Sequence, residues 1–414
     1  MPEVQELIPH LFRTEFRKIV SVLAKVFGLE HIETAEDIVS DTFLLAAETW
    51  RMKGLPENPT AWLYTVAKNK AKDYLKRDRL FNQKIAVELQ YASADGYETA
   101  IDLSDKNITD SQLQMMFALC HPAIPVQAQI GLSLRILCGL GIEEIADAFL
   151  SSKETINKRL FRAKEKLREE KISMELPPPT EIHKRLESVL RTLYLLFNEG
   201  YYSSTQHTAL RKDLCLTAMR LNLLLVENAT TNQPLVNALL ALMCFHASRF
   251  EARQHANGEI ILYAEQNEEL WDKELIKRGE YYLQQAATGN QLSKYHLEAA
   301  IAYWHTQKTD TREKWENILQ LYNRLLQLEY SPVAALNRTF ALAKVEDKPT
   351  AIVEALKLDL NENHLYHALL ANLYTEIDNQ KAIEHLQMAL KSTKTVSDQL
   401  TIHAKITQLI DLLP

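Results

Sequence analysis

The segment Gly139–Lys171 has the residue types and spacing of two short helices joined by a tight turn. Ser151-x-x-Glu154 has the spacing of a capping box, which predicts that the second helix begins there. The predicted inner face of that helix is apolar: Ile156, Leu160, Ala163 and Leu167. The predicted outer face is polar, with one ring: Glu154, Asn157, Lys158, Phe161, Arg162 and Glu165. Such a face can hydrogen-bond base edges and contact phosphates, but a surface hairpin with solvated charges fits the spacing equally well.

A second segment, residues 50–84, combines aromatic rings with positive charge. Trp62 and Tyr64 follow a turn at residues 54–59, and a basic helix is expected directly afterwards. The polar side chains of that helix are Lys68, Asn69, Lys70, Lys72, Asp73, Lys76, Arg77, Asp78 and Arg79. Rings beside a cationic helix suit single-stranded nucleic acid, because bases stack on rings while phosphates meet charge. An isolated tryptophan is usually a core residue, so the combination carries this interpretation.

A third segment, residues 34–43, is acidic at the start of a predicted helix. Helix capping by itself accounts for Thr34, Glu36 and Asp37. We expect Asp41 and Phe43 to lie exposed on the same helix, where they would dock a protein partner.

No pattern for catalysis stands out. The sequence has no Gly-rich phosphate loop, no H-E-x-x-H, no nucleophile elbow and no spaced set of metal ligands. Cys120-His121 and Cys244-Phe245-His246 each lack a second ligand pair, so we interpret them as packed core residues. The chain is therefore not expected to be an enzyme, and no cofactor or metal ion is expected.

The composition predicts an all-α fold in a chain too long for a single core. Among 414 residues there are only 10 Gly and 13 Pro, too few for a protein rich in strands and turns. The net charge of −7 excludes a surface covered with DNA-binding charge but not local basic patches. The four cysteines form no C-x-x-C pair, the first 18 residues carry charges unlike a signal peptide, and no apolar run approaches a membrane span. We expect a cytoplasmic protein with no membrane contact.

The periodicity divides the chain into five parts. Helical patterns cover residues 4–80 and 108–171, and an acidic linker at 81–107 separates them. This linker either follows the path of RNA through a nucleic-acid channel or is a plain tether. A Pro-rich break at 172–180 precedes a helical extension at 181–414.

The end of the extension, about 300–414, resembles tetratricopeptide repeats. Residues 315–322 fit a first-helix pattern, and the segments 336–340 and 370–374 lie 34 residues apart, which is the period of that repeat. Three residues fall where a second helix would pack: Ala382, Leu386 and Ala389. An unspecific helical bundle is the alternative.

Taken in order, the three N-terminal segments resemble the two domains of extracytoplasmic-function sigma factors. Residues 37–43 look like the helix that binds the clamp of the largest RNA polymerase subunit. Residues 58–73 look like the segment that opens and reads the −10 promoter element, and 142–168 like the helix-turn-helix reader of the −35 element. Ser40 departs from the Gln common at its position in the clamp helix.

The resemblance implies a role for specific residues in each segment. It assigns core-polymerase binding to Asp37, Asp41 and Phe43. It assigns −10 DNA binding to Asn58, Trp62, Tyr64, Lys68, Asn69, Asp73 and Arg77. It assigns −35 DNA binding to Lys153, Asn157, Lys158, Phe161 and Arg162. The implied partners are RNA polymerase core and promoter DNA.

The extension is similar to the tetratricopeptide-like tail of one sigma-factor subfamily, through residues 196–201, 239–243 and 265–272. That likeness implies regulation in cis or by a bound partner. A small-ligand pocket, a docking groove for a regulatory protein and a stabilising cap all stay open.

Two other functions are compatible with parts of the pattern. One is a helix-turn-helix regulator with a ligand-sensing helical domain, which would bind duplex promoter DNA without polymerase. The other is a tetratricopeptide-type scaffold that binds only protein. Neither requires the Trp62 segment with its basic helix, so that segment discriminates among the three.

Overall fold

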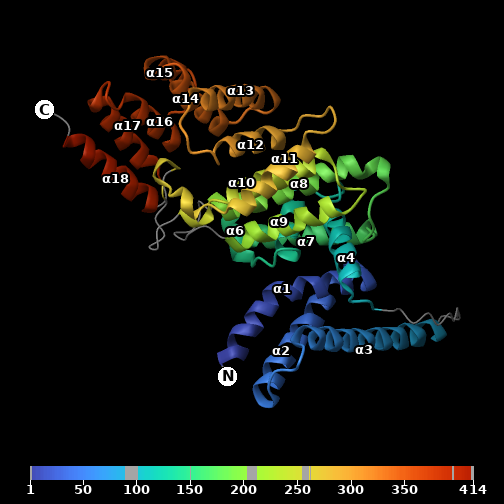
Figure 1. Ribbon diagram of the computed structural model, residues 1–414. Coiled ribbons are helices and arrows are strands. Elements are labelled where there is room, and N and C mark those ends of the chain that lie inside the picture. The colour runs from blue at the N-terminus through green and yellow to red at the C-terminus, as the bar shows by residue number, and fades with distance from the viewer. Residues whose placement is uncertain are drawn as a thin grey trace. The chain divides into compact units, whose positions relative to one another are not determined.

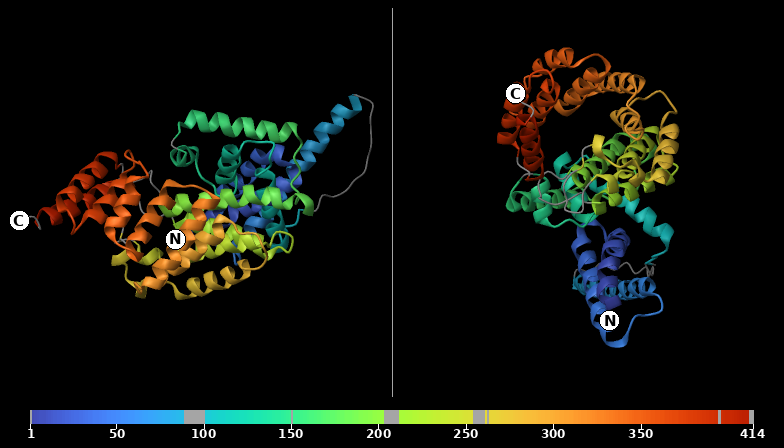
Figure 2. Two further views of the ribbon diagram at one scale, coloured as in Figure 1. Left: turned by 90° about the horizontal axis from the view of Figure 1, so that it is seen from above. Right: turned by 60° about the vertical axis from the view of Figure 1, so that its left-hand side comes forward.

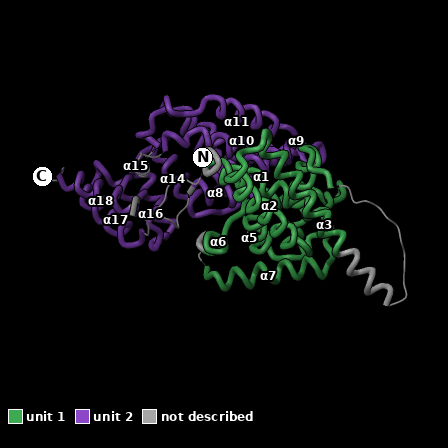
Figure 3. Tube along the Cα trace, turned by 90° about the horizontal axis from the view of Figure 1, so that it is seen from below, with its two compact units in different colours: residues 1–192 green, residues 193–414 purple. Residues whose placement is uncertain are grey.

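The computed structural model describes residues 2–88, 101–149, 151–202, 212–253, 261, 263–393 and 396–411. Within these ranges every regular element is a helix and there is no strand, which confirms the expected all-α class (Figure 1). The chain divides into two compact units, residues 1–192 and 193–414 (Figure 3).

The first unit begins with three long helices and a short 3-10 turn. These elements are α1 (Pro2–Phe27), η1 (Leu29–His31), α2 (Ile32–Lys53) and α3 (Pro59–Glu88). The apolar face of α1 is fully buried at Ile19, Val22 and Leu23 and packs against α2 and the later helix α4 (Asp105–Leu119). Gly28, with a φ of 92°, supplies the left-handed turn between α1 and η1 that most residues would adopt only under strain.

Three further helices of the first unit form a small cluster after α4. They are α5 (Val126–Ile136), α6 (Ile142–Ala148) and α7 (Lys153–Glu169). Gly131 in α5 gives Leu160 of α7 room, since a Cβ at Gly131 would stand 2.9 Å from the Leu160 side chain. The expected buried stripe of α7 is confirmed at all four positions: Ile156, Leu160, Ala163 and Leu167.

Two expected boundaries differ from the structure. The segment assigned to the linker is helical at both ends, because α3 runs to Glu88 and α4 begins at Asp105, where Ser104 accepts a hydrogen bond from the Asn107 N–H. The middle of the linker, residues 89–100, lies outside the described residues. The cap of α7 is Ser152 and not Ser151, because the Ser152 hydroxyl accepts the Thr155 N–H.

The Pro-rich break is present, but the division between the units does not fall on it. Residues 172–178 are not helical, and α8 (Pro179–Tyr202) starts on the last proline, where a missing N–H costs nothing. The division at 192/193 lies inside α8. The first half of α8 belongs to the first unit: Arg185 donates to the Phe117 carbonyl, and Thr192 lies 3.7 Å from the Cys120 sulfur.

The second unit continues with helices around a strongly apolar centre. Its first elements are the end of α8, α9 (Lys212–Glu227), α10 (Pro234–Ala247), η2 (Phe250–Ala252), η3 (Tyr263–Glu265), η4 (Glu268–Leu270), α11 (Lys273–Ala286) and α12 (Lys294–Trp304). Almost every residue of α10 is buried, as expected for a helix covered on all sides. Gly279 of α11 makes close packing possible, because a Cβ there would stand 2.5 Å from the Phe245 ring of α10.

The remaining helices follow one another along the chain as a row (Figures 1 and 2). They are α13 (Arg312–Leu328), α14 (Pro332–Val345), α15 (Lys348–Leu356), α16 (His364–Tyr374), α17 (Asn379–Ser392) and α18 (Val396–Ile410). Leu336 and Leu370, the residues 34 positions apart, are buried on α14 and α16. The positions expected on the second packing helix, Ala382, Leu386 and Ala389, are buried on α17. Contacts mainly between sequence neighbours are typical of helical repeats.

No helix among the described residues is long and apolar enough to cross a membrane.

Candidate nucleic-acid and partner-binding surfaces

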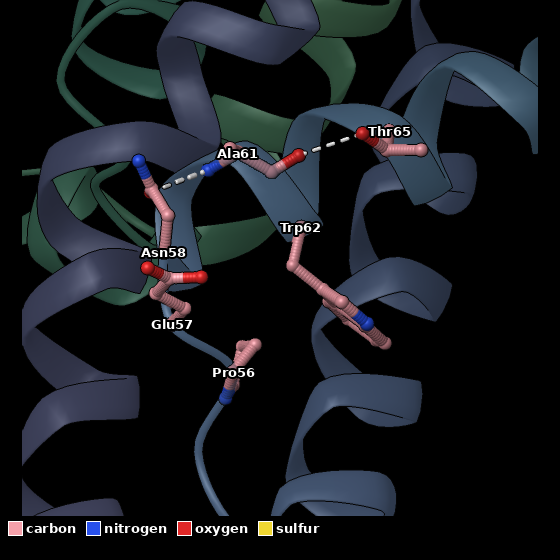
Figure 4. A pocket seen from close by; sticks show the side chains of 6 residues that line it. All are labelled: Pro56, Glu57, Asn58, Ala61, Trp62 and Thr65. Atoms are coloured by element: carbon pink, nitrogen blue, oxygen red, sulfur yellow. Dashed lines mark hydrogen bonds between the residues drawn. The ribbon is translucent and has the colours of Figure 1, made fainter.

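An open pocket lies at the start of α3 (Figure 4). Asn58 precedes the helix, and its side-chain Oδ1 accepts the Ala61 N–H at 3.0 Å, which satisfies one of the free donors of the first turn. The Trp62 ring is partly exposed and packs edge-on against buried Trp50, with 5.4 Å between ring centroids. The pocket is lined by Pro56, Glu57, Asn58, Ala61, Trp62 and Thr65. Its combination of ring, amide and open access suits an unstacked base.

The exposed face of α3 continues from this pocket with polar side chains, half of which are basic. The exposed residues are Thr65, Asn69, Lys72, Asp73, Lys76 and Arg77. Lys68 is half-buried, and Lys70 forms an ion pair with Asp41 of α2 at 3.4 Å. Phosphates can therefore contact the Lys72, Lys76 and Arg77 side of the helix without displacing a buried group.

Tyr64 does not lie with Trp62, contrary to the expectation. Two residues along a helix correspond to a rotation of about 200°, so their side chains point to nearly opposite sides. The Tyr64 hydroxyl donates to Glu15 Oε2 of α1 at 2.6 Å, and Glu15 is buried. Burial and the adjacent Glu15 carboxylate raise the pKa of Tyr64 well above its usual value. Tyr64 thus ties α3 to α1.

The same geometry separates Asp41 from Phe43 on α2. The expectation that Phe43 is exposed is wrong: it is buried, and its ring centroid lies 5.2 Å from that of Phe12 and 6.0 Å from that of Phe16. Asp41 is exposed, as expected. Phe43 therefore holds α2 against α1 and cannot anchor a partner from the surface.

The helix α7 presents the expected face to solvent. Its exposed residues include Lys153, Asn157, Lys158, Phe161 and Arg162. Lys153 is engaged in an ion pair with Glu143 of α6. Neither Lys158 nor Arg162 forms an ion pair with any described residue, so both cations are available to a ligand.

A different side of α7 packs against the start of α2. Lys164 Nζ lies 2.7 Å from Glu33 Oε1, and Arg168 donates to the Glu30 carbonyl at 3.4 Å. The Lys164 ammonium lowers the pKa of Glu33 through a hydrogen bond and its charge. This contact leaves the Asn157–Arg162 face uncovered within the first unit.

Two family models match the chain. A model described as Sigma-70 region 2 matches residues 11–80, and one described as Family of unknown function (DUF6596) matches residues 185–287.

Over most of its length the chain is similar to Uncharacterized protein R00370 of Rhizobium meliloti (strain 1021). The two are 31% identical over 354 residues, which cover 84% of this chain and 83% of the relative. The chain belongs to the family of this protein. A second relative, the ECF RNA polymerase sigma-E factor of Haemophilus influenzae (strain ATCC 51907 / DSM 11121 / KW20 / Rd), is 28% identical over 137 residues, or 31% of this chain and 70% of that protein. No solved structure matches.

The region 2 match and the sigma-E relative support a sigma-70 family factor with a sigma-factor-like role. The matched residues 11–80 contain most of α1, all of α2 and the start of α3, hence the Trp62 pocket and the acidic face of α2. The model of the family of unknown function matches the chain over α8–α11. No match identifies a tetratricopeptide repeat or a helix-turn-helix.

The sequence interpretation missed the exposed apolar residues of α2, which are Leu44, Leu45 and Met52. Leu44 is 61% exposed and shares a face with Asp37, Asp41 and Glu48, all exposed. The spacing of 4, 3 and 4 residues along 37, 41, 44 and 48 is the signal that identifies this face.

Proposed function

We propose that this chain is a sigma factor that directs RNA polymerase core to specific promoters and helps to open the −10 element. The observation that carries the proposal is the coincidence of the region 2 match with the Trp62 pocket and the basic face of α3. A protein-binding scaffold has no need of a ring-lined pocket that continues into exposed lysines.

In this proposal α2 docks the clamp of the largest polymerase subunit. Asp37 and Asp41 supply charge and Leu44 supplies the apolar anchor. Apolar anchors at the centre of an interface carry much of its binding free energy, whereas exposed charges mainly set association rate and specificity. The Lys70–Asp41 ion pair is exposed and weak, so it opens at little cost when a partner approaches Asp41.

The start of α3 then holds a base of the opened −10 element. The Trp62 ring offers a stacking surface, and the Asn58 Nδ2 amide is a donor beside it. Extrusion of a base costs a few kcal/mol, which stacking and phosphate contacts along Asn69 and Lys72 offset. Tyr64 supports this surface from behind through Glu15.

The helix α7 reads the −35 element in the same proposal. Its exposed Asn157 and Arg162 have the side chains that pair with adenine and guanine edges, and Lys158 suits a phosphate. The pair α6–α7, joined by the short segment 149–152, would act as the helix-turn-helix. The extension from α8 onward would regulate or stabilise this machinery.

Co-elution with core polymerase tests the docking surface. Leu44→Asp should abolish co-elution while the far-ultraviolet circular dichroism stays unchanged. Leu216→Asp is the matched control, because Leu216 is a similarly exposed leucine on α9. Normal co-elution of Leu44→Asp would rule out α2 as the docking helix.

A further inference from the structure

Two buried cations of the second unit lie close to one tyrosine ring. Arg249, which follows α10, is 8% exposed, and its guanidinium carbon lies 5.5 Å from the ring centroid of Tyr263. Lys314, in the first turn of α13, is 2% exposed, and its Nζ lies 5.3 Å from the same centroid. We call these residues, together with Gln266, Trp271 and His305 around them, the Tyr263 cluster.

Neither cation has an anionic partner among the described residues. The Arg249 side chain makes no hydrogen bond or ion pair with any of them, and its Nε is buried without an acceptor. Lys314 Nζ donates to the Tyr263 hydroxyl at 3.1 Å and to the Gln307 carbonyl, and both acceptors are neutral. The carboxylate of Asp310 is already occupied, since it accepts from Trp315 Nε1 and from Lys344 Nζ.

Burial without a counter-charge is unfavourable for both groups. A buried charge is normally paired, and a ring face compensates for only part of the lost hydration. Burial lowers the pKa of Lys314; the charge of Asp310 opposes this shift in part, and the charge of Arg249 adds to it. Burial, with the charges of Arg249 and Lys314, also lowers the pKa of His305 to about 3, so this imidazole adds no third positive charge.

Three neutral polar atoms of the cluster are buried and have no hydrogen-bond partner among the residues that the structure describes. They are Gln266 Oε1, Trp271 Nε1 and His305 Nδ1. The Trp271 and His305 ring centroids lie 6.3 Å and 5.1 Å from that of Tyr263. Buried polar atoms are nearly always satisfied in folded proteins, so these three atoms around one ring are suited to hydrogen-bond a bound group.

We propose that the Tyr263 cluster is a binding site for the oxyanion of a small molecule, a phosphate or a carboxylate group. Arg249 and Lys314 supply the charge, and a guanidinium can hold two oxygens of such a group at once. The unpaired atoms of Trp271, His305 and Gln266 serve the uncharged part of the ligand. The site stands independently of the proposed role in transcription. Arg249, Tyr263 and Trp271 lie within the matched family of unknown function, whereas His305 and Lys314 lie beyond it.

Calorimetric titration of the full chain with inorganic phosphate, and separately with acetate, tests the site. Chloride at matched ionic strength is the background. We expect saturable binding to the wild type, and the tighter of the two anions identifies the ligand group. Arg249→Gln should weaken binding at least tenfold. Arg312→Gln, an exposed arginine on α13, is the matched control and should bind like the wild type.

Thermal unfolding separates a ligand role from a structural role of Arg249. Without the anion, Arg249→Gln should melt no lower than the wild type, because the change removes an uncompensated buried charge. Low concentrations of the bound anion should raise the melting temperature of the wild type but not of this variant. Phosphate also stabilises folded proteins in general, and this effect is the same for all variants. The evidence for a site is therefore the difference between the wild type and Arg249→Gln in the rise of the melting temperature.

Three results would overturn the proposal. The first is the absence of saturable binding of either anion to the wild type. The second is equal binding by Arg249→Gln. The third is a variant that unfolds without anion, because Arg249 would then be needed by the fold itself.

Discussion

On each of the helices α2 and α3, side chains two positions apart point to opposite sides. This explains which residues of each helix face a partner. Phe43 is buried two positions from exposed Asp41. Tyr64, two positions from partly exposed Trp62, points to the other side of α3 and contacts Glu15 of α1. Their contacts with α1 hold the exposed surfaces of α2 and α3 in place. Along the sequence of α2 and α3, residues proposed to contact a partner are thus followed within a few positions by residues that hold the helix in place.

Phe43 and Leu44 are neighbours with opposite expected effects on stability. Phe43→Ala should lower the free energy of unfolding by about 3 to 5 kcal/mol, because it leaves a cavity among the rings of Phe12 and Phe16. Leu44→Ala should change it by no more than about 0.5 kcal/mol, because Leu44 is exposed. Urea denaturation measures both. Equal losses would mean that Phe43 is not the residue that joins α2 to α1.

On α7, substitutions of Arg162 and Lys158 should have different effects: the first on the preference for particular −35 sequences, the second on the affinity for DNA in general. Arg162→Ala should weaken promoter use and relax preference at one or two −35 positions, worth about 1–3 kcal/mol per discriminated base. Lys158→Ala should lower affinity for all sequences and flatten the salt dependence. Selection from a randomised −35 library measures both. An unchanged preference in Arg162→Ala would remove α7 as the reader.

Phe161 on the same face distinguishes DNA contact from packing. Its ring is 65% exposed, so Phe161→Ser should leave the melting temperature nearly unchanged and alter −35 preference. A large loss of thermal stability with intact preference would instead indicate that the ring packs against another part of the protein.

Glu298 of α12 should make stability depend on pH. Burial raises its pKa to about 7, although the Tyr194 hydroxyl donates to its Oε1 at 3.2 Å and Lys294 opposes the shift. At pH values between the ordinary carboxyl pKa and about 7, Glu298 is ionised in the unfolded chain but protonated in the folded chain. The contribution of Glu298 to the free energy of unfolding is therefore complete below the ordinary carboxyl pKa. It is lost as the pH rises toward 7.

Glu298→Gln should remove that dependence and raise the free energy of unfolding above pH 7 by up to a few kcal/mol. Denaturation at several pH values measures the effect, with Glu313→Gln on exposed α13 as control. A variant that is less stable than the wild type at pH 8 would contradict a protonated Glu298.

At the scale of elements, helical periodicity accounts for what the sequence could predict. The inward stripe of α7 follows from spacing alone, and so does the exposed face opposite it. The prediction that Phe43 is exposed was wrong because it grouped Phe43 with Asp41 by their closeness in sequence. It ignored the rotation of the helix between the two positions. The Tyr263 cluster lay beyond sequence reasoning, because Arg249 and Lys314 meet only through the packing of α10, α12 and α13 and the short turns between them.

The helix α8 decides where the chain can be cut. Its buried residues Ile182, Leu186 and Val189 belong to the first unit, and Arg185 contacts the Phe117 carbonyl. Truncation after Leu176 should therefore expose apolar surface and aggregate, whereas truncation after Thr192 should give a soluble, folded fragment. Size-exclusion chromatography and thermal unfolding compare the two. A well-behaved fragment ending at Leu176 would show that α8 is not part of the first unit.

The Thr192 fragment also tests a regulatory role for the extension. If the extension regulates initiation, the fragment should differ from the full chain in promoter activity. Unchanged activity in a soluble fragment would remove the regulatory interpretation.

In the whole molecule, the two units carry different surfaces and sites. The first carries an exposed acidic face on α2, a ring-lined pocket on α3 and an exposed cationic face on α7. The second carries the Tyr263 cluster and the row of helices α13–α18. A sigma factor needs the three surfaces of the first unit at once, whereas a DNA-binding regulator needs only α7.

Run-off transcription with purified core polymerase, on a pool of genomic fragments from the same organism, tests the central claim most directly. We predict that the full chain makes core initiate at defined start sites, and that Trp62→Ala lowers initiation at least tenfold while binding to core persists. The matched control is Trp304→Ala in the second unit. If core stays inactive with the full chain, or if the chain binds duplex promoter DNA without core and Trp62→Ala changes nothing, the chain is not a sigma factor.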